Sequence, residues 1–420
     1  MLQLTGAAVT GGTVLAAGDR TRAGASAPSA PADSAEAVKL QKLLAASESE
    51  SAKAPAPWPQ QRRVGVAVVG LGRLALEQIL PAFGDSHRCR LTALVSGDPA
   101  KARQVAAQYG VDPRSLYDYR TFDRLRDDPA VELVYIVLPN GLHAEFTVRA
   151  AHAGKHVLCE KPMANSVAEC QQMIDACEQA RKQLMIAYRM QYEPYNREAI
   201  RMARAGALGK LKGFSAMNGQ TQGDPRQWRL KKSLAGGGAL VDLGIYCLNA
   251  ARYLSGEEPI EVAALQHSTP NDPRFTEVEE QLDFVVRFPS GLMASCTTSY
   301  GYHNAKRYRL MGETGFVELD PAFPYRGQTL RVGRKAEAAG GESLQTLVLP
   351  PKNQFALELD HMAERLRAGQ KPHTPGEEGM QDMKIIAAIY DAASSGHAVP
   401  LPAPSRPDAF RGPPPAPPAD

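Results

Sequence analysis

The sequence has few cysteines, and none of them stand at the spacing of a metal site. Its 420 residues include six cysteines and no C-x-x-C motif. Cys170 and Cys177 lie seven residues apart on a predicted helix, about two turns from each other, which is too far for a disulfide bond. We therefore expect the cysteines to be buried as small hydrophobic side chains, and we expect no metal site.

The sequence also lacks a strong charge imbalance and a long uninterrupted apolar run. Its 48 basic and 45 acidic residues give a net charge of +3 without a basic cluster, so nucleic acid is not an expected partner. We find no stretch of the length that a membrane-spanning helix needs, and we expect no membrane contact. Hydrophobic residues make up 44% of the chain, which is enough for sizeable cores, and the length favours two domains.

The first 59 residues contain few of the large apolar side chains that a packed core needs. Residues 2–17 are small and apolar, and Arg20 and Arg22 follow. The pattern resembles the hydrophobic region of an export signal without its basic start, which a twin-arginine pair upstream would complete as a Tat signal. A flexible leader without an address is the alternative. We expect a periplasmic protein with a flexible arm over residues 1–59, and a cytoplasmic location is the alternative.

One stretch carries the clearest structural signal. Residues 64–69 form a run of small and β-branched apolar side chains, and Gly70, Gly72 and Ala75 follow in the spacing G-x-G-x-x-A. The run predicts a buried parallel strand, and the glycines predict a tight turn that opens a helix. This is the dinucleotide-binding fingerprint. Gly70 allows the turn, Gly72 lets backbone approach a pyrophosphate, and the helix N-terminus attracts the phosphates.

Strand and helix patterns then alternate up to about residue 190. Further strands are predicted at residues 90–96, 131–138, 156–159 and 184–188, with helices between them. Such alternation predicts right-handed β–α–β units and a parallel sheet, whose ligands bind beyond the carboxyl ends of its strands. We therefore expect a Rossmann domain over residues 60–190.

After residue 190 the pattern changes to strand-like runs joined by turns, with a helix predicted at residues 238–254 and two more at the end. Hairpin spacing predicts a largely antiparallel open sheet. The expected fold class is α/β, with an N-terminal Rossmann dinucleotide-binding domain and a C-terminal α+β domain over residues 191–399. The Pro-rich segment 400–420 is expected to be disordered.

Several motifs resemble those of the Gfo/Idh/MocA oxidoreductases, over residues 64–400. The matching segments are Gly70-Leu71-Gly72, Leu138-Pro139-Asn140 with His143, Cys159-Glu160-Lys161-Pro162-Met163-Ala164 and the run from Gly236 to Tyr246. Tyr246 stands where most members carry His, which favours the glucose–fructose oxidoreductase branch.

The resemblance implies an NADP-dependent enzyme that acts on CH–OH groups of small sugars. In this branch an aldose is oxidised to its lactone and a ketose is reduced to its alditol on the same tightly bound NADP. An ordinary sugar or polyol dehydrogenase with exchangeable NAD(P) is the alternative, and a nucleotide-binding regulator without chemistry is a third hypothesis. The resemblance also implies a homo-oligomer, a tetramer or dimer, with substrate and oligomer contacts in residues 191–399.

Three residues are candidates for the chemistry. Hydride transfer from a carbinol needs a group that takes the hydroxyl proton and cations that stabilise the alkoxide. Lys161 follows a strand end beside the fingerprint, and Tyr246 supplies a phenol, which ionises more readily beside an ammonium. Asp242 lies one helical turn before Tyr246, where it can hold the sugar or orient the pair. The alternatives are a surface strand end for Lys161, a solvent-facing Asp242 and a core phenol for Tyr246.

The end of the second strand favours NADP over NAD. An NAD-selective site places Asp or Glu about 20 residues beyond the glycines, but here the strand ends at Ser96, and Lys101 follows. A hydroxyl and cations, including Arg73, suit a 2′-phosphate, and we expect Asp98 to cap the next helix.

The resemblance implies a larger set of residues around the bound cofactor. These residues are Gly70, Leu71, Gly72, Arg73, Leu74, Ser96, Lys101, Tyr119, Leu138, Asn140, His143, Glu160, Lys161, Arg189, Trp228 and Arg229. Tyr325 is a further cofactor candidate, and Tyr192 either faces the substrate or packs in the core.

Overall fold

The structure is a computed structural model that describes residues 56–336, 341–402, 404 and 406–415. The export signal and nearly all of the expected N-terminal arm lie outside the described residues. Trp58, close to the start of the described chain, donates its backbone N–H to His87 at 2.9 Å, and its ring stacks with Arg62 and Arg88.

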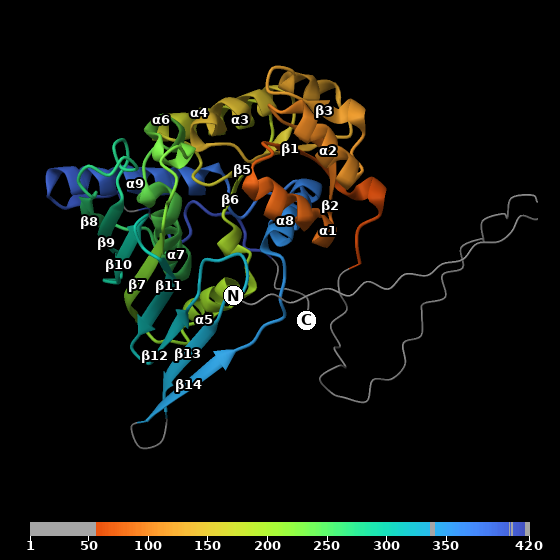
Figure 1. Cartoon of the computed structure of the whole chain (residues 1–420). Helices are drawn as coiled ribbons and strands as arrows, with labels where there is room; N and C mark the ends of the chain where they lie inside the picture. Colours follow the sequence, from red (N-terminus) through yellow and green to blue (C-terminus); the bar gives the residue numbers. More distant parts are fainter. Residues whose placement is uncertain (1–55, 337–340, 403, 405, 416–420) are drawn as a thin grey trace, which may run out of the picture. The chain divides into compact units, whose positions relative to one another are not determined.

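A six-stranded parallel sheet forms around the strand before the glycine turn (Figure 1). Its order is β3-β2-β1-β4-β5-β6, so the direction of winding reverses beside β1. Every residue of β1 is buried, as its apolar run predicts. The strands are β1 (Val64–Val69), β2 (Cys89–Val95), β3 (Leu116–Tyr117), β4 (Leu133–Ile136), β5 (His156–Glu160) and β6 (Leu184–Ala187).

The helices of this part follow the predicted alternation. The chain after the glycines enters a π-helical turn, η3 (Ala75–Ile79), which runs into the short helix α1 (Leu80–Asp85). Asp98 caps the next helix by accepting the N–H groups of Ala100 and Lys101, as expected. The remaining helices are α2 (Pro99–Tyr109), α3 (His143–His152) and α4 (Val167–Gln179).

The second sheet has nine strands and is antiparallel except where β7 and β10 pair. The order is β14-β13-β12-β11-β7-β10-β9-β8-β15, which confirms the largely antiparallel sheet. Burial alternates along β9 and β10, so one face of the sheet is covered and the other is not. The strands are β7 (Leu211–Gln220), β8 (Glu261–His267), β9 (Gln281–Arg287), β10 (Met293–Ser299), β11 (Asn304–Gly312), β12 (Gly315–Leu319), β13 (Leu330–Lys335), β14 (Glu342–Leu347) and β15 (Val399–Pro400).

Helices α5 (Pro194–Arg204), α7 (Ile245–Ser255) and α9 (Gly376–Ser395) pack on this sheet. One further helix, α8 (Gln354–Ala368), returns to the first sheet, where it packs against α1 and β2 (Figure 1). Phe355 and Leu359 of α8 belong to the same buried cluster as Val66 and Leu94. Helix α8, which falls in the range predicted for the C-terminal domain, thus packs its apolar side chains on the parallel sheet.

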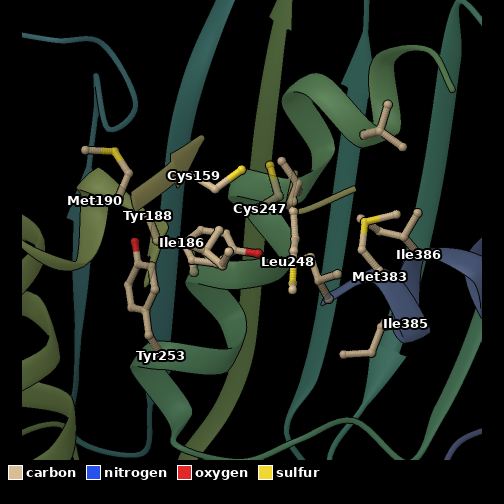
Figure 2. Packing of buried hydrophobic residues seen from close by; sticks show 14 of the residues in the cluster. Cys159, Ile186, Tyr188, Met190, Cys247, Leu248, Tyr253, Met383, Ile385 and Ile386 are labelled. Carbon is tan, nitrogen blue, oxygen red and sulfur yellow. The ribbon is translucent and has the colours of Figure 1, made fainter. Parts of the chain in front are cut away.

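The two sheets share a hydrophobic core. Figure 2 shows Cys159 and Ile186 from β5 and β6 in one cluster with Leu248 of α7 and Ile386 of α9. All six cysteines are free and buried, as expected. A continuous core fixes the ends of β5 and β6 relative to α7, which matters for the site below.

The C-terminal segment differs from the expected disorder. Over residues 406–415 the chain is held by Arg411, whose buried Nε donates to Glu378 of α9 at 3.1 Å. Gly412 N–H donates to His373 O at 3.0 Å. The proline content predicted disorder. Arg411, three residues before Pro414, instead anchors this part of the tail as a counter-ion of the buried Glu378.

The apolar stretch Lys232–Ser255 also corrects a sequence-based expectation, because its 24 residues are long and apolar enough for a membrane span by length and composition alone. Within the fold, 78% of its most apolar window is buried. Packing in the core accounts for that composition, and α7 is the helix that carries Tyr246.

Candidate active site

A cleft of about 880 Å³ lies at the carboxyl ends of the parallel strands and extends to β7 and β11 of the second sheet. This volume is near the upper end of the range for small-molecule sites. Nearly all of the predicted site residues line it together. They are Gly70, Leu71, Gly72, Arg73, Leu74, Ser96, Lys101, Tyr119, Leu138, Asn140, Glu160, Lys161, Arg189, Trp228, Arg229, Asp242 and Tyr246, and Tyr325 lines it as well.

The glycine turn leaves room for a ligand. Gly70 has a φ of 95°, and a Cβ there would lie 2.4 Å from Val137 O, so the protein itself requires glycine. A Cβ on Gly72 would meet no protein atom within 4 Å. The space beside Gly72 is therefore open to the cleft, as the close approach of a pyrophosphate requires.

The end of β2 presents a hydroxyl and a cation rather than a free carboxylate. Ser96 is buried, and its Oγ accepts the N–H of Asp98 at 3.1 Å. The Asp98 carboxylate is engaged in the α2 cap, where hydrogen bonds from the Lys101 and Ala100 amides lower its pKa. The exposed Lys101 lines the cleft beside them. This set suits a phosphate better than a ribose hydroxyl.

Two predicted residues lie elsewhere. His143 is fully buried, and its ring nitrogens lie 2.9 Å from Pro162 O and Leu138 O, so it ties together two turns behind the cleft. The motif places His143 near the cofactor in sequence, but the start of α3 turns the ring toward the backbone. Tyr192 packs in the core with its hydroxyl 2.9 Å from Thr374 Oγ1, as in the core alternative.

The three candidate catalytic residues meet at one end of the cleft. Lys161 Nζ donates to Asp242 O at 2.7 Å and lies 3.3 Å from Asp242 Oδ1. It also lies 4.6 Å from the centre of the Tyr246 ring. Asp242 Oδ2 accepts from Arg229 Nε and from Tyr300 OH, both at 3.1 Å. The side chains of Lys161 and Asp242 are only 11% and 15% exposed.

The electrostatics of this cluster keep Asp242 ionised. Burial alone would raise the pKa of the Asp242 carboxyl, but the charges of Arg229 and Lys161 outweigh burial and lower the pKa to about 2. Both carboxylate oxygens are occupied by protein donors. Asp242 thus joins Lys161, Arg229 and Tyr300 in one network at this end of the cleft.

Asp242 and Tyr246 lie on two consecutive helical segments of different type. Asp242 lies in a π-helical segment, η9 (Leu240–Gly244), which runs directly into α7. Glu279 caps its start by accepting the N–H groups of Gly238 and Leu240 at 2.8 and 2.9 Å. π-Helical turns are frequent at functional sites, and nothing in the local sequence indicated this one.

Arg189 and Arg229 line the cleft but are occupied by protein groups. Arg229 stacks on Trp228, with 4.5 Å between its Cζ and the ring centre, and pairs with Asp242. Arg189 is buried and donates to Phe323 O at 2.7 Å and to Gln354 Oε1 at 2.5 Å. Both arginines thus lie at the end of the cleft that holds Lys161, Asp242 and Tyr246.

A polar wall that we did not predict faces the same end. Asn218 and Gln220 of β7 and Gln222 beyond it line the cleft, and Lys306 of β11 donates to Gln220 Oε1 at 3.2 Å. The signal was available, because alternate positions of this strand change from apolar to amide side chains after Ala216. Asn218 Oδ1 is buried without a partner among the described residues, which suits a ligand hydroxyl or amide.

Comparison with known proteins agrees with this geometry. The family described as "Oxidoreductase family, NAD-binding Rossmann fold" matches residues 64–188, and "GFO/IDH/MocA C-terminal domain" matches residues 196–318. The chain is 32% identical over 349 residues to a D-xylose 1-dehydrogenase [NADP(+)] of Haloarcula marismortui, covering 80% of this chain and 93% of the relative.

A solved structure is more similar still. The crystal structure of an aldose–aldose oxidoreductase from Caulobacter crescentus, complexed with glycerol, is 48% identical to this chain. It matches with a TM-score of 0.78 over 81% of this chain and all of that one. A D-xylose 1-dehydrogenase (NADP(+)) 2 of Haloferax volcanii is 29% identical over 334 residues, covering 80% of this chain and 98% of the relative. The chain belongs to the Gfo/Idh/MocA family of NAD(P)-binding oxidoreductases.

Proposed function

We propose that the protein is an NADP-dependent sugar oxidoreductase that keeps its cofactor and couples oxidation of an aldose to reduction of a second sugar. The convergence of Lys161, Asp242 and Tyr246 at one end of a dinucleotide-sized cleft carries the proposal. The similarity to an aldose–aldose oxidoreductase supports the coupled reaction, and the similarity to D-xylose dehydrogenases supports the sugar class.

The residues present fit NADP. The open space at Gly72 and the first turn of η3 suit the pyrophosphate, and Ser96 and Lys101 suit a 2′-phosphate. When bound, the cofactor supplies the carbon that accepts and returns a hydride. The buried acceptor Asn218 Oδ1 and the polar side chains of Gln220 and Lys306 face the remaining space, where sugar hydroxyls need partners.

Side chains of the protein carry out the proton transfer. Tyr246, as a phenolate, takes the proton of the sugar hydroxyl while the C–H bond gives up its hydride, and as a phenol it returns that proton to the second sugar's carbonyl oxygen. The Lys161 ammonium stabilises negative charge on either oxygen. Asp242 holds Lys161 in place through its backbone carbonyl and its carboxylate.

The test uses purified protein without added nicotinamide, mixed with glucose and fructose or with glucose and a second aldose. We expect aldonate and alditol in equal amounts, and NADP in solution after denaturation. Turnover that requires added NADP, without released NADP, would assign the ordinary dehydrogenase. Retained NADP without turnover on any sugar pair would favour the regulator.

A further inference from the structure

Arg189 lines the cleft as a cofactor residue would, yet its donors point into the protein. It follows β6 at the start of a short 3₁₀ turn, η7 (Arg189–Gln191), and is 6% exposed. Its guanidinium donates to the carbonyls of Phe323 and Pro324, at 2.7 and 3.4 Å, and to the amide oxygen of Gln354 at 2.5 Å. A longer contact of 3.6 Å reaches Met190 Sδ. Every one of these acceptors is uncharged.

The face of this guanidinium is turned toward aromatic rings. Arg189 Cζ lies 4.9 Å from the centre of the Tyr246 ring and 4.7 Å from that of Tyr325. Tyr246 therefore has two cations against its ring, since Lys161 Nζ lies 4.6 Å from the same centre. Cation–π contacts with desolvated rings are strong enough to hold a side chain in one orientation.

Burial opposes ionisation of two carboxyls whose charges act on Arg189. Glu160 and Glu358 share the hydroxyl of Tyr135, at 2.8 and 3.5 Å, and both are buried. Burial raises the pKa of each carboxyl, which favours the neutral form. Burial alone would lower the pKa of the Arg189 guanidinium, but the facing phenols of Tyr246 and Tyr325 hold it above its usual value. Arg189 thus keeps its charge beside Tyr246.

The other charged groups around Tyr246 come from separate elements. Lys161 follows β5, Asp242 lies on η9, and Lys306 projects from β11. Asp242 is already paired with Lys161 and Arg229, and Lys306 donates to the amide of Gln220. Among the described residues, Arg189 and Lys161 are thus the two cations in contact with the ring.

We propose that Arg189 is a positioning residue for the proton-transfer step, and that it holds the Tyr246 phenol and stabilises negative charge on its oxygen instead of binding the cofactor. The role rests on the function proposed above. In the oxidative half-reaction the Tyr246 oxygen gains the hydroxyl proton as the hydride leaves the sugar carbon. In the reductive half-reaction it loses that proton to the second sugar. Arg189 favours the anion that is present before the first of these events and again after the second.

The test compares Arg189→Met and Arg189→Lys with Lys101→Met, a variant of a predicted phosphate-binding residue. Each protein is assayed for NADP released on denaturation and for kcat per bound NADP across pH. We expect Arg189→Met to retain NADP, to lose about 3- to 30-fold in kcat, and to shift the rising limb of the profile upward by roughly one pH unit. Arg189→Lys should restore most of that shift. Lys101→Met should lose NADP and keep the limb in place.

Loss of NADP from Arg189→Met, with an unchanged profile in the molecules that remain loaded, would overturn the proposal and make Arg189 a cofactor residue. If Arg189→Met does not fold, Arg189→Lys decides. A limb within about 0.3 pH units of the wild type, at reduced kcat, supports the charge role, and a shift as large as that expected for the Met variant contradicts it. Wild-type protein without NADP and without turnover would overturn the function itself.

Discussion

Two buried clusters of arginines and carboxylates in this protein differ in their surroundings. In the sealed cluster, Arg252 is fully buried and pairs with Glu258, Glu378 and Asp382, and Arg411 of the tail completes it. At the end of the cleft, one ionised carboxylate, Asp242, faces several cations, with a cavity in front of them.

The difference lies in what each cluster leaves unpaired. Every charged group of the sealed cluster has an opposite charge among its neighbours, so it has nothing to offer a ligand. The catalytic cluster keeps Arg189 and Lys306 on uncharged acceptors. An excess of cations beside an open cavity favours negative charge that develops during a reaction. Ion pairing alone therefore does not mark a functional site, whereas ion pairing with a surplus beside a cavity does.

The largest expected effect is a loss of kcat when the cluster beside the cleft is changed at Tyr246. Tyr246→Phe should keep the cofactor and lose kcat by about 10²–10⁴, the usual contribution of a positioned proton-transfer group. The matched control is Tyr253→Phe on the same helix. The Tyr253 hydroxyl donates to Asn196 Oδ1 at 2.8 Å, and Tyr253 does not line the cleft of about 880 Å³. It should keep kcat and lose about 1 kcal/mol of stability. Wild-type turnover by Tyr246→Phe, measured with glucose, would remove Tyr246 from the mechanism.

The next largest effect is a loss of folding stability when the sealed cluster is changed at Arg252. Arg252→Met leaves buried acids without their main counter-ion and should lower the free energy of unfolding by about 3–5 kcal/mol. The matched control is Arg287→Met, which removes a half-exposed pair with Glu261 and should cost less than about 1 kcal/mol. Urea unfolding of the three proteins measures both. Similar losses for the two variants would show that burial does not distinguish these pairs.

One aspartate from each cluster should respond to pH with the opposite sign to the other. Burial raises the pKa of the Asp382 carboxyl to about 6, so the folded state binds this proton more tightly than the unfolded chain. Its contribution is present below about pH 4 and lost as pH rises through 6. Asp242, with its pKa lowered to about 2, contributes stability above about pH 4 that is lost on acidification.

The variant Asp382→Asn separates these contributions. It should remove a fall in stability of up to about 3 kcal/mol between about pH 4 and pH 7. The measurement is urea unfolding of the wild type and the variant at several pH values in that interval, so that the titration of Asp242 in the unfolded chain is common to both. An unchanged slope in Asp382→Asn would contradict the assignment to Asp382.

The smallest expected effect is a change in the preference for NADP over NAD at the other end of the cleft. Ser96→Asp should weaken NADP binding relative to NAD by about tenfold or more, because a carboxylate repels the 2′-phosphate and accepts from a ribose hydroxyl. Titration of cofactor-free protein with both nucleotides gives the ratio. Asp98→Ala is the control. It should cost about 1 kcal/mol of helix stability without changing the ratio, since Asp98 caps α2. An unchanged ratio in Ser96→Asp would move the phosphate elsewhere.

Local sequence pattern determined much of this protein. The apolar run before Gly70, the alternation up to β6 and the antiparallel second sheet follow from periodicity and turn chemistry, which depend on near neighbours. Motif spacing also selected Lys161, Asp242 and Tyr246, which the structure brings to one place. These features are local, or they end at the same edge of a parallel sheet.

Tertiary structure alone decided the orientation of the long polar side chains and their hydrogen-bond and ion-pair partners. The sequence predicts Arg189 and His143 near the cofactor. Arg189 lines the cleft but donates to Phe323 O and Gln354 Oε1, and the His143 ring lies against two backbone carbonyls. The tail is ordered at Arg411 because the carboxylate of Glu378, 33 residues earlier, requires a counter-ion. Pairing of buried charges joins residues with no periodic relation in the chain, so only the packed fold reveals the partners.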